Sequence, residues 1–370
     1  MNVLIDLTYI DPNNPTGVSV YAERLISGLQ LNSEINVHVL CTHGNQSYIK
    51  TVFPSLLFHE FVNPLKGANP LNVYRRNTYG AKLTTLCKKH NIQIFFLPFL
   101  TLWSAIPQGS KVVAVVHDTQ PLSLNSKLKN YFYRRVLKHN LEKCDKIVNI
   151  SNYVKDDLGK IYPSLVDRQV TIYNSIEYVA PTSFESCVFK NKYILNVNAM
   201  IAYKNQFTLL KAFNLIKDKT SHNLVFKGGN NDYWRTEMLP YIKLNKLEDR
   251  VFLVDNKLSK SELAYLYHNA DVFVNPSLME GFGFTPIEAA IQETTVLTTS
   301  VTSLKETTMG LLNYIDNPMD DTEYADKILN IIETKTSQNN LSQVRDCLLS
   351  KYSIENQVND FVKLFVEICA

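Results

Sequence analysis

Short apolar runs rich in Val, Ile and Phe alternate with longer segments of helical period along most of the chain. Parallel strands that are covered by helices on both faces produce such runs, because both faces are buried. The alternation therefore predicts an α/β protein with doubly wound parallel sheets. In the first half we expect strands at Val3–Leu7, Ile35–Cys41, Leu56–Phe61, Ile92–Leu97, Val112–His117, Lys146–Ile150 and Val170–Tyr173, and helices at Val18–Leu29, Tyr74–His90, Ser126–Leu141 and Val154–Tyr162.

The alternation stops at Ile176–Asn191, where Pro181 and a mixture of polar and aromatic residues replace it, and then starts again. Such a break marks a domain boundary. We expect an N-terminal domain at 1–176, a linker at 177–191 and a C-terminal domain at 192–352. In the second half we expect strands at Tyr193–Val197, Leu224–Phe226, Val251–Val254, Val272–Asn275 and Val296–Thr299, and helices near Gln206–Ile216, Trp234–Leu244, Lys260–Tyr267, Pro286–Gln292 and Glu323–Thr334.

The composition fits two domains and excludes several classes of protein. The 370 residues, with 45% hydrophobic and 20% charged side chains, exceed one typical domain and are neither disordered nor collagen-like. No apolar run approaches the ~20 residues that span a bilayer, and the opening residues have no basic lead, so we expect a cytoplasmic chain. The six cysteines form no Cys-x-x-Cys pair, which argues against a zinc site and a disulfide framework.

The segment from Asp271 to Ala290 is the most informative for function. It predicts three elements in succession: a buried strand, a loop that carries Glu280, and a helix that starts at Thr285-Pro286 with Glu288 in its first turn. Glycines permit a bend and the close approach of a ligand, and backbone N–H groups beside a helix N-terminus bind anions. We therefore expect a diphosphate or sugar oxygens at Gly281, Phe282, Gly283 and Phe284.

Glu288 also has a purely structural interpretation. The sequence Thr285-Pro-Ile-Glu288 fits a capping box, in which the carboxylate accepts from a backbone N–H at the start of the helix. Capping requires neither Glu280 nor the Gly-Phe-Gly bend, so both interpretations of Glu288 stay open here.

Residues 276–289 read Pro-Ser-Leu-Met-Glu-Gly-Phe-Gly-Phe-Thr-Pro-Ile-Glu-Ala. This string resembles the donor-binding signature of retaining GT-B glycosyltransferases of glycosyltransferase family 4. The resemblance implies two Rossmann-like domains that face each other across a cleft, with a last helix within 353–370 that returns to the first domain. It also implies that Glu280 lies against the donor sugar and that Glu288 binds the ribose hydroxyls of the nucleotide.

The stretch Tyr193–Asn205 is similar to the strand and loop of the same family that end in Lys-Asn. The resemblance implies that Lys204 neutralises the donor diphosphate, since an ammonium group is a suitable point charge for phosphate; a solvated loop lysine is the alternative. The chain departs from the family around this loop. Asn198, Ala199 and Tyr203 stand where an arginine is usual, so the second cation of the diphosphate site is missing from its usual position.

Two segments of the first domain resemble the family as well. Val113–Asp118 is similar to a strand that ends in His-Asp, which implies that His117 lies near the donor sugar and the acceptor; a structural histidine is the alternative. Pro15–Leu25 looks like the glycine loop that opens the first helix. Gly17 is then expected to bring backbone N–H groups to the donor phosphates, unless it forms only a turn.

The chain contains no Asp-x-Asp, the usual carboxylate motif that holds a divalent cation against a sugar nucleotide. We therefore expect transfer without a metal or other cofactor, with Lys204, backbone amides and a helix dipole meeting the charge of the leaving diphosphate. The resemblance implies retention by a front-face mechanism, in which the leaving phosphate helps to deprotonate the acceptor hydroxyl.

The two halves of the chain differ in charge. Residues 1–180 contain 19 Lys and Arg against 12 Asp and Glu, whereas residues 181–370 contain 19 against 23. A basic helix with interleaved aromatic residues is typical of a membrane surface, so we expect peripheral contact with an anionic membrane, unless its aromatic face packs in the core. No nucleic-acid motif is present, and no nucleic acid is expected as a partner. The basic residues concerned are Lys127, Lys129, Arg134, Arg135 and Lys138.

The sequence thus predicts a hexosyltransferase of bacterial surface polysaccharide synthesis, such as that of O-antigen or capsule. The expected donor is a GDP- or UDP-linked sugar, and the expected acceptor is a glycan or lipid-linked oligosaccharide. Two alternatives remain: a GT-B sugar-nucleotide epimerase, against which the Glu280 and Glu288 pair argues, and a catalytically degenerate glycan- or nucleotide-binding partner of another transferase. An NAD(P) oxidoreductase is remote, because the loop lacks the third glycine and the downstream acid of a dinucleotide fingerprint.

Overall fold

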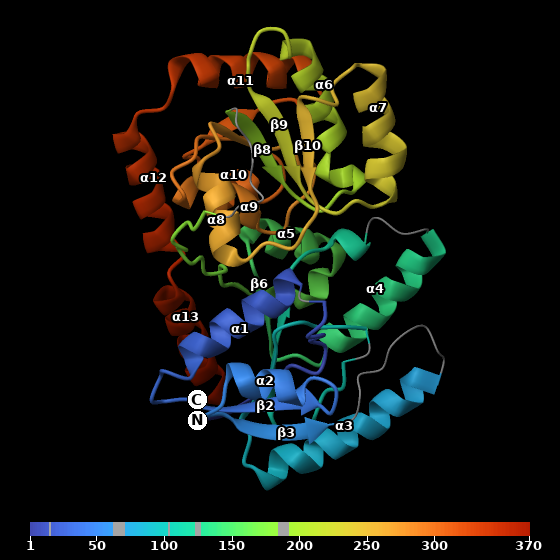
Figure 1. Ribbon diagram of the computed structural model, residues 1–370. Helices are drawn as coiled ribbons and strands as arrows, with labels where there is room; N and C mark the ends of the chain where they lie inside the picture. Colours follow the sequence, from blue (N-terminus) through green and yellow to red (C-terminus); the bar gives the residue numbers. More distant parts are fainter. Residues whose placement is uncertain (15, 62–70, 103, 123–126, 184–191) are drawn as a thin grey trace. The chain divides into compact units, whose positions relative to one another are not determined.

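The computed structural model describes residues 1–14, 16–61, 71–102, 104–122, 127–183 and 192–370, with the backbone alone for 71–77, 121 and 127–129 (Figure 1). The chain divides into two compact units. Unit 1 consists of Met1–Ser175 and Tyr352–Ala370, and unit 2 of Ile176–Lys351. Of the predicted linker, residues 177–183 belong to unit 2 and residues 184–191 lie outside the described ranges.

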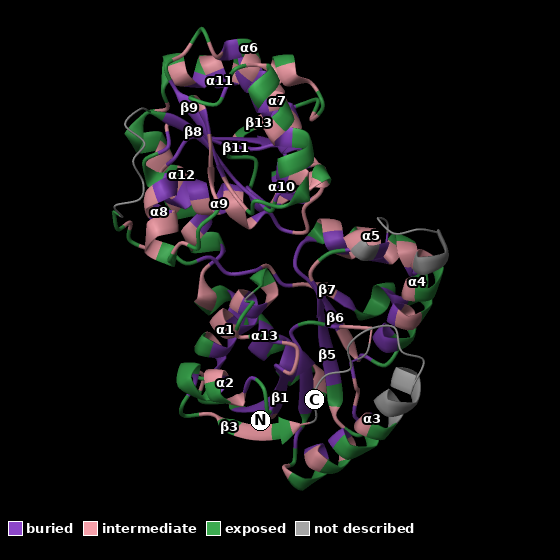
Figure 2. Cartoon of the chain, turned by 45° about the vertical axis from the view of Figure 1, so that its right-hand side comes forward, coloured by how far each residue is buried: buried purple, intermediate pink, exposed green. Residues whose placement is uncertain are grey.

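Unit 1 is built on a seven-stranded parallel sheet with the order β3-β2-β1-β4-β5-β6-β7. Its central strands are buried on both faces, as the apolar runs predict, and Figure 2 shows them in purple beneath helices with exposed outer faces. The strands are β1 (Asn2–Asp6), β2 (Asn36–Thr42), β3 (Leu57–Phe61), β4 (Ile94–Leu97), β5 (Lys111–Val116), β6 (Lys146–Asn149) and β7 (Gln169–Thr171). The helices are α1 (Gly17–Leu29), α2 (Gln46–Val52), α3 (Leu71–Lys89), α4 (Lys127–Leu141), α5 (Asn152–Ile161) and α13 (Ile354–Cys369), with short 3-10 turns at Gln120–Leu122 and Pro163–Arg168.

Helix α13 completes the core of unit 1, although all of unit 2 precedes it in the sequence. Its Phe361 and Phe365 pack edge-on against Phe96 of β4, with ring centroids 5.2 and 5.7 Å away. It also packs against α1, where a Cβ atom added to Gly28 would lie 2.5 Å from a methyl group of Val358. The close approach of the two helices therefore depends on glycine at this position.

Unit 2 contains a six-stranded parallel sheet with the order β10-β9-β8-β11-β12-β13. The strands are β8 (Tyr193–Val197), β9 (Asn223–Lys227), β10 (Val251–Val254), β11 (Val272–Asn275), β12 (Val296–Thr299) and β13 (Asn313–Ile315). The helices are α6 (Gln206–Ile216), α7 (Leu239–Leu244), α8 (Lys260–His268), α9 (Phe284–Ile291), α10 (Leu304–Thr307), α11 (Asp321–Thr334) and α12 (Gln338–Lys351), with a 3-10 turn at Ala202–Lys204.

The structure confirms the doubly wound α/β class and differs from the sequence prediction in details. The predicted helix Trp234–Leu244 is a π-helical turn, Trp234–Met238, followed by α7. Pro240, near the start of α7, has no N–H to donate to the preceding turn, so a regular α-helix cannot run through it. The elements that the sequence analysis missed are short or rich in polar residues: α2, α10, α12 and β13.

Candidate functional site

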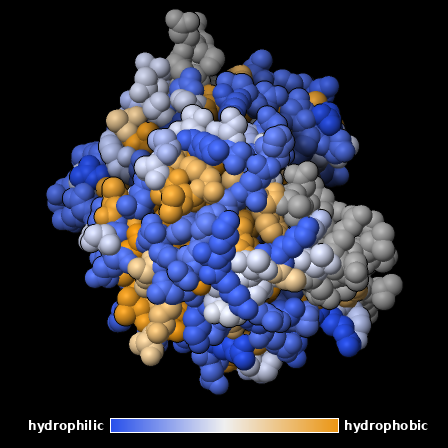
Figure 3. Space-filling model, turned by 90° about the horizontal axis from the view of Figure 1, so that it is seen from below, coloured by the Kyte–Doolittle hydropathy of each residue, from blue (hydrophilic) through white to orange (hydrophobic). Residues whose placement is uncertain are grey.

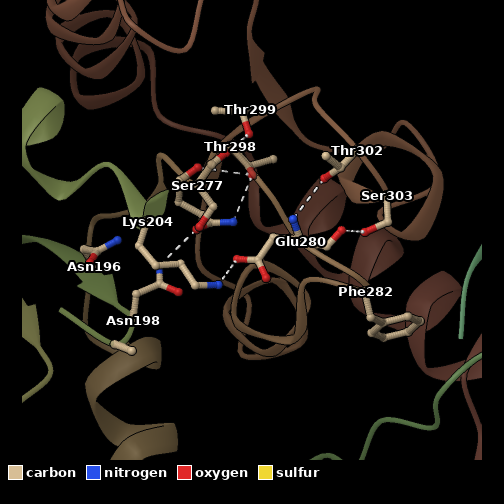
Figure 4. Close-up of polar contacts among 12 residues, drawn as sticks. Asn196, Asn198, Lys204, Ser277, Glu280, Phe282, Thr298, Thr299, Thr302 and Ser303 are labelled. Atoms are coloured by element: carbon tan, nitrogen blue, oxygen red, sulfur yellow. Dashed lines mark hydrogen bonds and ion pairs between the residues drawn. The ribbon is translucent and has the colours of Figure 1, made fainter. Parts of the chain in front are cut away.

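Three loops meet at the carboxyl edge of the unit 2 sheet, the edge at which open α/β sheets bind ligands. They follow β8, β11 and β12, which are neighbours in the sheet. The first loop carries Lys204, the second carries Glu280, and the third carries Thr302 and Ser303; Figure 4 shows the side chains together.

Lys204 and Glu280 form an ion pair at this edge. The Lys204 Nζ lies 2.6 Å from the Glu280 Oε1, and the two side chains are only 13% and 12% exposed. Opposite charges attract more strongly where protein replaces water. The structure therefore brings together the two residues expected to bind the diphosphate and the donor sugar, and it pairs them with each other.

The position of Lys204 is set by its neighbour Asn205. Asn205 has a φ of 58°, the left-handed conformation that asparagine tolerates, and it ends the 3-10 turn and precedes α6. Its side-chain amide donates to the carbonyls of Pro276 and Pro318, at 3.2 and 2.7 Å. The lysine loop is thereby fastened to the loop that carries Glu280.

Buried amides lie beneath the ion pair and join β8 to β11. The Asn198 amide donates to the Asn275 Oδ1 at 3.0 Å, and Ser277 Oγ donates to the same oxygen at 2.8 Å. Asn196 donates to the carbonyl of Val274 at 2.8 Å. Asn198 therefore acts as a neutral strand-to-strand link at a position where the sequence analysis notes the loss of a usual arginine. Buried polar groups of this kind need such partners.

The glycine loop turns into α9 at Gly283. Gly283 has a φ of 81° and is the N-cap residue, with no side-chain cap, and α9 begins at Phe284 rather than at Thr285. A Cβ atom at Gly283 would lie 2.5 Å from Leu304, so the position requires glycine for two reasons. Phe282 and Gly283 are buried, whereas Gly281 and Phe284 are partly exposed.

The capping-box interpretation of Glu288 is wrong. Thr285 lies inside the helix, so its hydroxyl is not at the N-cap, and Glu288 is one residue beyond the first turn. The Glu288 Oε2 instead accepts from the Tyr267 hydroxyl at 3.0 Å. Burial, together with the Glu288 carboxylate, raises the pKa of Tyr267 well above its usual range, so this phenol remains a hydrogen-bond donor that orients the carboxylate.

His117 lies at the corresponding edge of unit 1, directly after β5. Its Nε2 is 2.8 Å from the carbonyl oxygen of Pro98, which can only accept, so Nε2 carries the ring proton and Nδ1 is an acceptor. Burial lowers the pKa of His117 to about 4, and the ring is neutral near pH 7. It packs edge-on against Tyr21 at 4.7 Å and lies near Phe99 at 6.2 Å.

Gly17 is the first residue of α1, and it is exposed with no atom within 4 Å of an added Cβ. A real capping box begins this helix: Thr16 Oγ1 accepts from the Ser19 N–H, and Ser19 Oγ accepts from the Thr16 N–H. The open space beside Gly17 is compatible with the predicted ligand contact and does not require it.

The predicted basic patch lies on α4, and its described residues differ in role. The Arg134 guanidinium turns to the carbonyl of Leu122, at 3.0 and 3.2 Å, so it anchors the helix. Arg135 donates to the Tyr131 hydroxyl at 3.2 Å, and Lys138 pairs with Glu142 at 3.6 Å. The side chains of Lys127 and Lys129 lie outside the described residues.

The aromatic residues of α4 do not all pack in the core. Tyr131 and Phe132 are 63% and 52% exposed, whereas Leu137 and Leu141 are buried. Among the helices that the structure describes, none is long and apolar enough to cross a bilayer. On the face drawn in Figure 3, hydrophobic residues form separate orange patches in a largely hydrophilic surface.

The sequence analysis missed the residues that hold Glu280 in place. Glu280 donates its backbone N–H to Thr302 Oγ1 and accepts at its carbonyl from Ser303 Oγ, both at 3.0 Å. The signal was present as a run rich in hydroxyl residues, Thr298-Thr-Ser-Val-Thr-Ser303, which begins in a buried strand and continues past its end. Hydroxyl side chains at a strand end commonly bond to nearby backbone. Within the described ranges, no three His, Cys, Asp or Glu side chains form a candidate metal site.

Comparison with known proteins identifies relatives of both units. A family model described as Glycosyltransferase Family 4 matches residues 15–178, and one described as Glycosyl transferases group 1 matches residues 184–344. The O-antigen chain mannosyltransferase RfbU of Salmonella typhimurium is 26% identical over 320 residues, which is 85% of this chain and 87% of the relative. An N-acetylgalactosamine-N,N'-diacetylbacillosaminyl-diphospho-undecaprenol 4-alpha-N-acetylgalactosaminyltransferase of Campylobacter jejuni is 26% identical over 316 residues, 80% of this chain and 83% of its own length.

Solved structures share the fold over the whole chain. Sucrose-phosphate synthase from Thermosynechococcus elongatus has a TM-score of 0.77 at 17% identity and covers 99% of this chain and 98% of its own. Anabaena HepE, solved in complex with UDP and glucose, has a TM-score of 0.73 at 14% identity, with 98% and 99% covered. At these identities, the likeness establishes the architecture of the two units.

Proposed function

Because the chain belongs to glycosyltransferase family 4 and has the GT-B fold, we propose that it transfers a hexose from a nucleotide-diphosphate sugar to a glycan acceptor, with retention and without a metal ion. The observation that supports this most directly is the Lys204–Glu280 pair at the carboxyl edge of the unit 2 sheet. A cation for phosphate and a carboxylate for sugar hydroxyls lie side by side, at the point where a sugar diphosphate needs both.

Lys204 has three N–H donors and can keep one bond to Glu280 while another meets a diphosphate oxygen. Charge develops on that diphosphate as the glycosidic bond to it breaks, so a fixed cation favours the transition state over the bound donor. Glu288, oriented by Tyr267, would accept from the ribose hydroxyls. His117 would accept a hydrogen bond at Nδ1 from a hydroxyl group of the donor sugar or the acceptor.

The curated relatives suggest the biological role. The Salmonella relative is named for O-antigen chain mannose transfer and the Campylobacter relative for transfer to an undecaprenol-linked sugar. We infer that the present chain extends a lipid-linked oligosaccharide in the synthesis of a bacterial surface polysaccharide. Mannose and N-acetylgalactosamine are accordingly the first donor sugars to test.

The test is a thermal-shift and calorimetric screen of UDP, GDP, ADP, CMP and dTDP in EDTA, followed by GDP-mannose, UDP-glucose and UDP-N-acetylgalactosamine. A ligand that binds the folded chain raises its melting temperature. One nucleoside diphosphate should bind without metal, and its sugar conjugate should be turned over. If no nucleotide binds and no donor is consumed, the chain is instead a degenerate partner of another transferase; binding that strictly requires Mg²⁺ would refute the metal-free mechanism.

A membrane-bound acceptor requires the enzyme to approach the bilayer, and we propose that α4 does so. The exposed Tyr131 and Phe132 and the neighbouring Arg135 combine apolar insertion with attraction to anionic headgroups. Replacing all three, as Tyr131→Ser, Phe132→Ser and Arg135→Glu, should reduce sedimentation with vesicles that contain phosphatidylglycerol. Arg134 is left intact because it anchors the helix. Unchanged sedimentation would remove α4 from the membrane contact.

A further inference from the structure

A series of hydroxyl groups on β12 and the segment after it bonds to the backbone of the end of β11 and of the loop that carries Glu280. The donors and the acceptors run in the same order along the sequence. Thr298 Oγ1 donates to the carbonyl of Asn275 at 3.3 Å, Thr299 Oγ1 to Ser277 at 2.7 Å, Ser303 Oγ to Glu280 at 3.0 Å and Thr307 Oγ1 to Phe282 at 2.6 Å.

Thr302 lies between Thr299 and Ser303 of this series, but its hydroxyl accepts a hydrogen bond from the backbone, whereas the others donate one. It receives the backbone N–H of Glu280 at 3.0 Å. Together with Ser303, it therefore binds both polar groups of the Glu280 backbone, the N–H and the carbonyl (Figure 4). The carboxylate of the same residue meets Lys204. Glu280 is thus held at three points, two of which come from the segment after β12.

Thr302 adopts a conformation that is unusual for its residue type. Its φ is 54°, in the left-handed region, which a β-branched side chain avoids because its Cβ atom crowds the backbone. Such strain persists only where the surroundings over-determine it, and it concentrates at functional sites. Glycine would adopt this φ without strain, but glycine has no hydroxyl to receive the Glu280 N–H.

We propose that Thr302 is a positioning residue for Glu280: its hydroxyl, held in place by a strained backbone, fixes the Glu280 amide and thereby aims the carboxylate at the donor sugar. The proposal rests on the proposed function and adds to it a residue that lies outside the donor-binding string. The hydrogen bond from the Glu280 N–H to the Thr302 hydroxyl offsets the backbone strain at Thr302. The hydroxyl and the left-handed backbone are therefore both needed to position Glu280.

The experiment compares four variants of the full chain. Thr302→Val keeps the shape and loses the acceptor oxygen, Thr302→Ser keeps the oxygen, and Thr302→Gly relieves the strain and loses the oxygen. Thr308→Val is the matched control, because the Thr308 hydroxyl bonds to the carbonyl of Leu304 and the hydroxyl of Tyr314 and has no hydrogen bond to the Glu280 backbone among the described contacts. Each variant is assayed for kcat and for nucleoside diphosphate affinity, and by hydrogen exchange of the peptide that contains the Glu280 amide.

Loss of the oxygen should lower kcat by about 10–100-fold in both Thr302→Val and Thr302→Gly, since a small misplacement of a binding group costs this much. Nucleoside diphosphate affinity should change less than about twofold, because Lys204 and Glu288 are untouched. Thr302→Ser should restore kcat, and Thr308→Val should leave it near that of the wild-type chain. Hydrogen exchange of the Glu280 peptide should accelerate in Thr302→Val and Thr302→Gly, and in neither of the other two variants.

The outcomes separate the proposal from the function on which it rests. Full kcat in Thr302→Gly, which has no reason to fold poorly, would overturn the positioning role. Equal loss of kcat in Thr308→Val would show a general packing effect and would overturn it too. If the wild-type chain consumes no donor, the proposed function fails, and unchanged exchange in Thr302→Val would then overturn the proposal by itself.

Discussion

The two sheets share a strand order, but their carboxyl edges differ in chemistry. In each sheet the second and third strands lie on one side of the first, and the fourth to sixth lie on the other; unit 1 adds a seventh strand beyond its sixth. The unit 2 edge carries an ion pair, buried amides and hydroxyls that bind backbone. The unit 1 edge carries aromatic rings around a neutral histidine, with Tyr9 against Phe99 at 5.3 Å and Tyr21 against His117 at 4.7 Å.

The comparison shows that one topology can carry edges of two different chemistries, and each chemistry suits a different kind of ligand. Charged and polar groups held by three loops suit a charged diphosphate, because they are already arranged when it arrives. Aromatic faces and a hydrogen-bond acceptor suit the weakly polar ring of a sugar, which needs apolar contact and a few placed polar groups. Fold alone therefore does not assign the units their tasks; the residues after each strand do.

The largest expected effect comes from breaking the charged edge of unit 2. Lys204→Met should lower transfer by about 10²–10³-fold, because it removes the cation that we propose for the leaving diphosphate and takes away the partner of Glu280. Glu280→Gln should also abolish transfer, yet it should bind nucleoside diphosphate about tenfold more tightly, since Lys204 is no longer shared with a carboxylate.

Calorimetry with the nucleoside diphosphate measures the affinity of Glu280→Gln and that of the wild-type chain. The matched control is Lys192→Met, at a lysine that pairs with Asp271 at 3.8 Å, largely exposed, at the opposite end of β8. It should leave transfer unchanged. If Glu280→Gln bound the nucleotide no better than the wild-type chain, the ion pair would not compete with phosphate.

The next largest effect is expected from a substitution at the aromatic edge of unit 1. His117→Ala should lower kcat by about 10-fold to 10²-fold, because a polar hydroxyl in the site loses its hydrogen-bond acceptor, while nucleoside diphosphate affinity stays within about twofold. Steady-state kinetics and calorimetry on the same preparation separate the two quantities. A loss of nucleotide affinity instead of kcat would mean that unit 1 does not differ from unit 2 in the way described.

Substitutions at two glycines, one in each unit, should have smaller effects, and these effects concern the stability of the chain. Gly283→Ala should destabilise the chain by about 1–3 kcal/mol, because alanine meets both a positive φ and the Leu304 side chain. Gly17→Ala, where the added Cβ meets no atom within 4 Å, should change stability by less than about 0.5 kcal/mol. Urea unfolding measures both. A stable Gly17→Ala that loses donor binding would place Gly17 in contact with the ligand.

The smallest expected effect is an acid sensitivity of unit 1. Burial, with help from His90, lowers the pKa of His59 to about 4, and burial also lowers that of His38. The His38 Nδ1 and His59 Nε2 lie 2.9 Å apart, so both rings cannot be charged comfortably. A lowered folded-state pKa means that the unfolded chain binds more protons, so this stability is complete above about pH 6.5 and is lost as the pH falls toward 4.

His59→Gln should therefore reduce the drop in melting temperature between pH 7.5 and 5.0 by about 2–4 °C. His43→Gln, at a side chain that is 91% exposed, is the control and should leave the drop unchanged. An identical drop in His59→Gln would locate the acid-sensitive groups elsewhere.

The class of fold was predictable because parallel strands buried on both faces leave apolar runs that can be recognised one by one. The weak segments were not. Helix α12 is rich in Gln, Asn and Ser; Leu348 is its buried side chain, and Arg345 pairs with Glu293. Strand β13 has three residues and depends on pairing with β12. Both elements are stabilised by residues outside their own segments, so the local sequence pattern does not predict them.

A motif predicted the members of the candidate site, but it did not predict their contacts with one another. Lys204 and Glu280 are 76 positions apart, and only the folded sheet shows that they pair. Thr302 gave no signal of its left-handed backbone, because threonine is the wrong residue type for it. The capping-box prediction for Glu288 failed because Gly283, with its positive φ, starts the helix earlier than Thr285.

The return of α13 to unit 1 has a consequence for biosynthesis. A ribosome delivers the chain from the N-terminus, and domains generally fold as they emerge. Unit 2 is contiguous in the sequence, so all of it is available before Phe361 and Phe365 leave the exit tunnel. The first unit to be translated is then the last to be completed, and the nascent protein carries the apolar site around Phe96 uncovered until that moment. Chaperones would find their main target there.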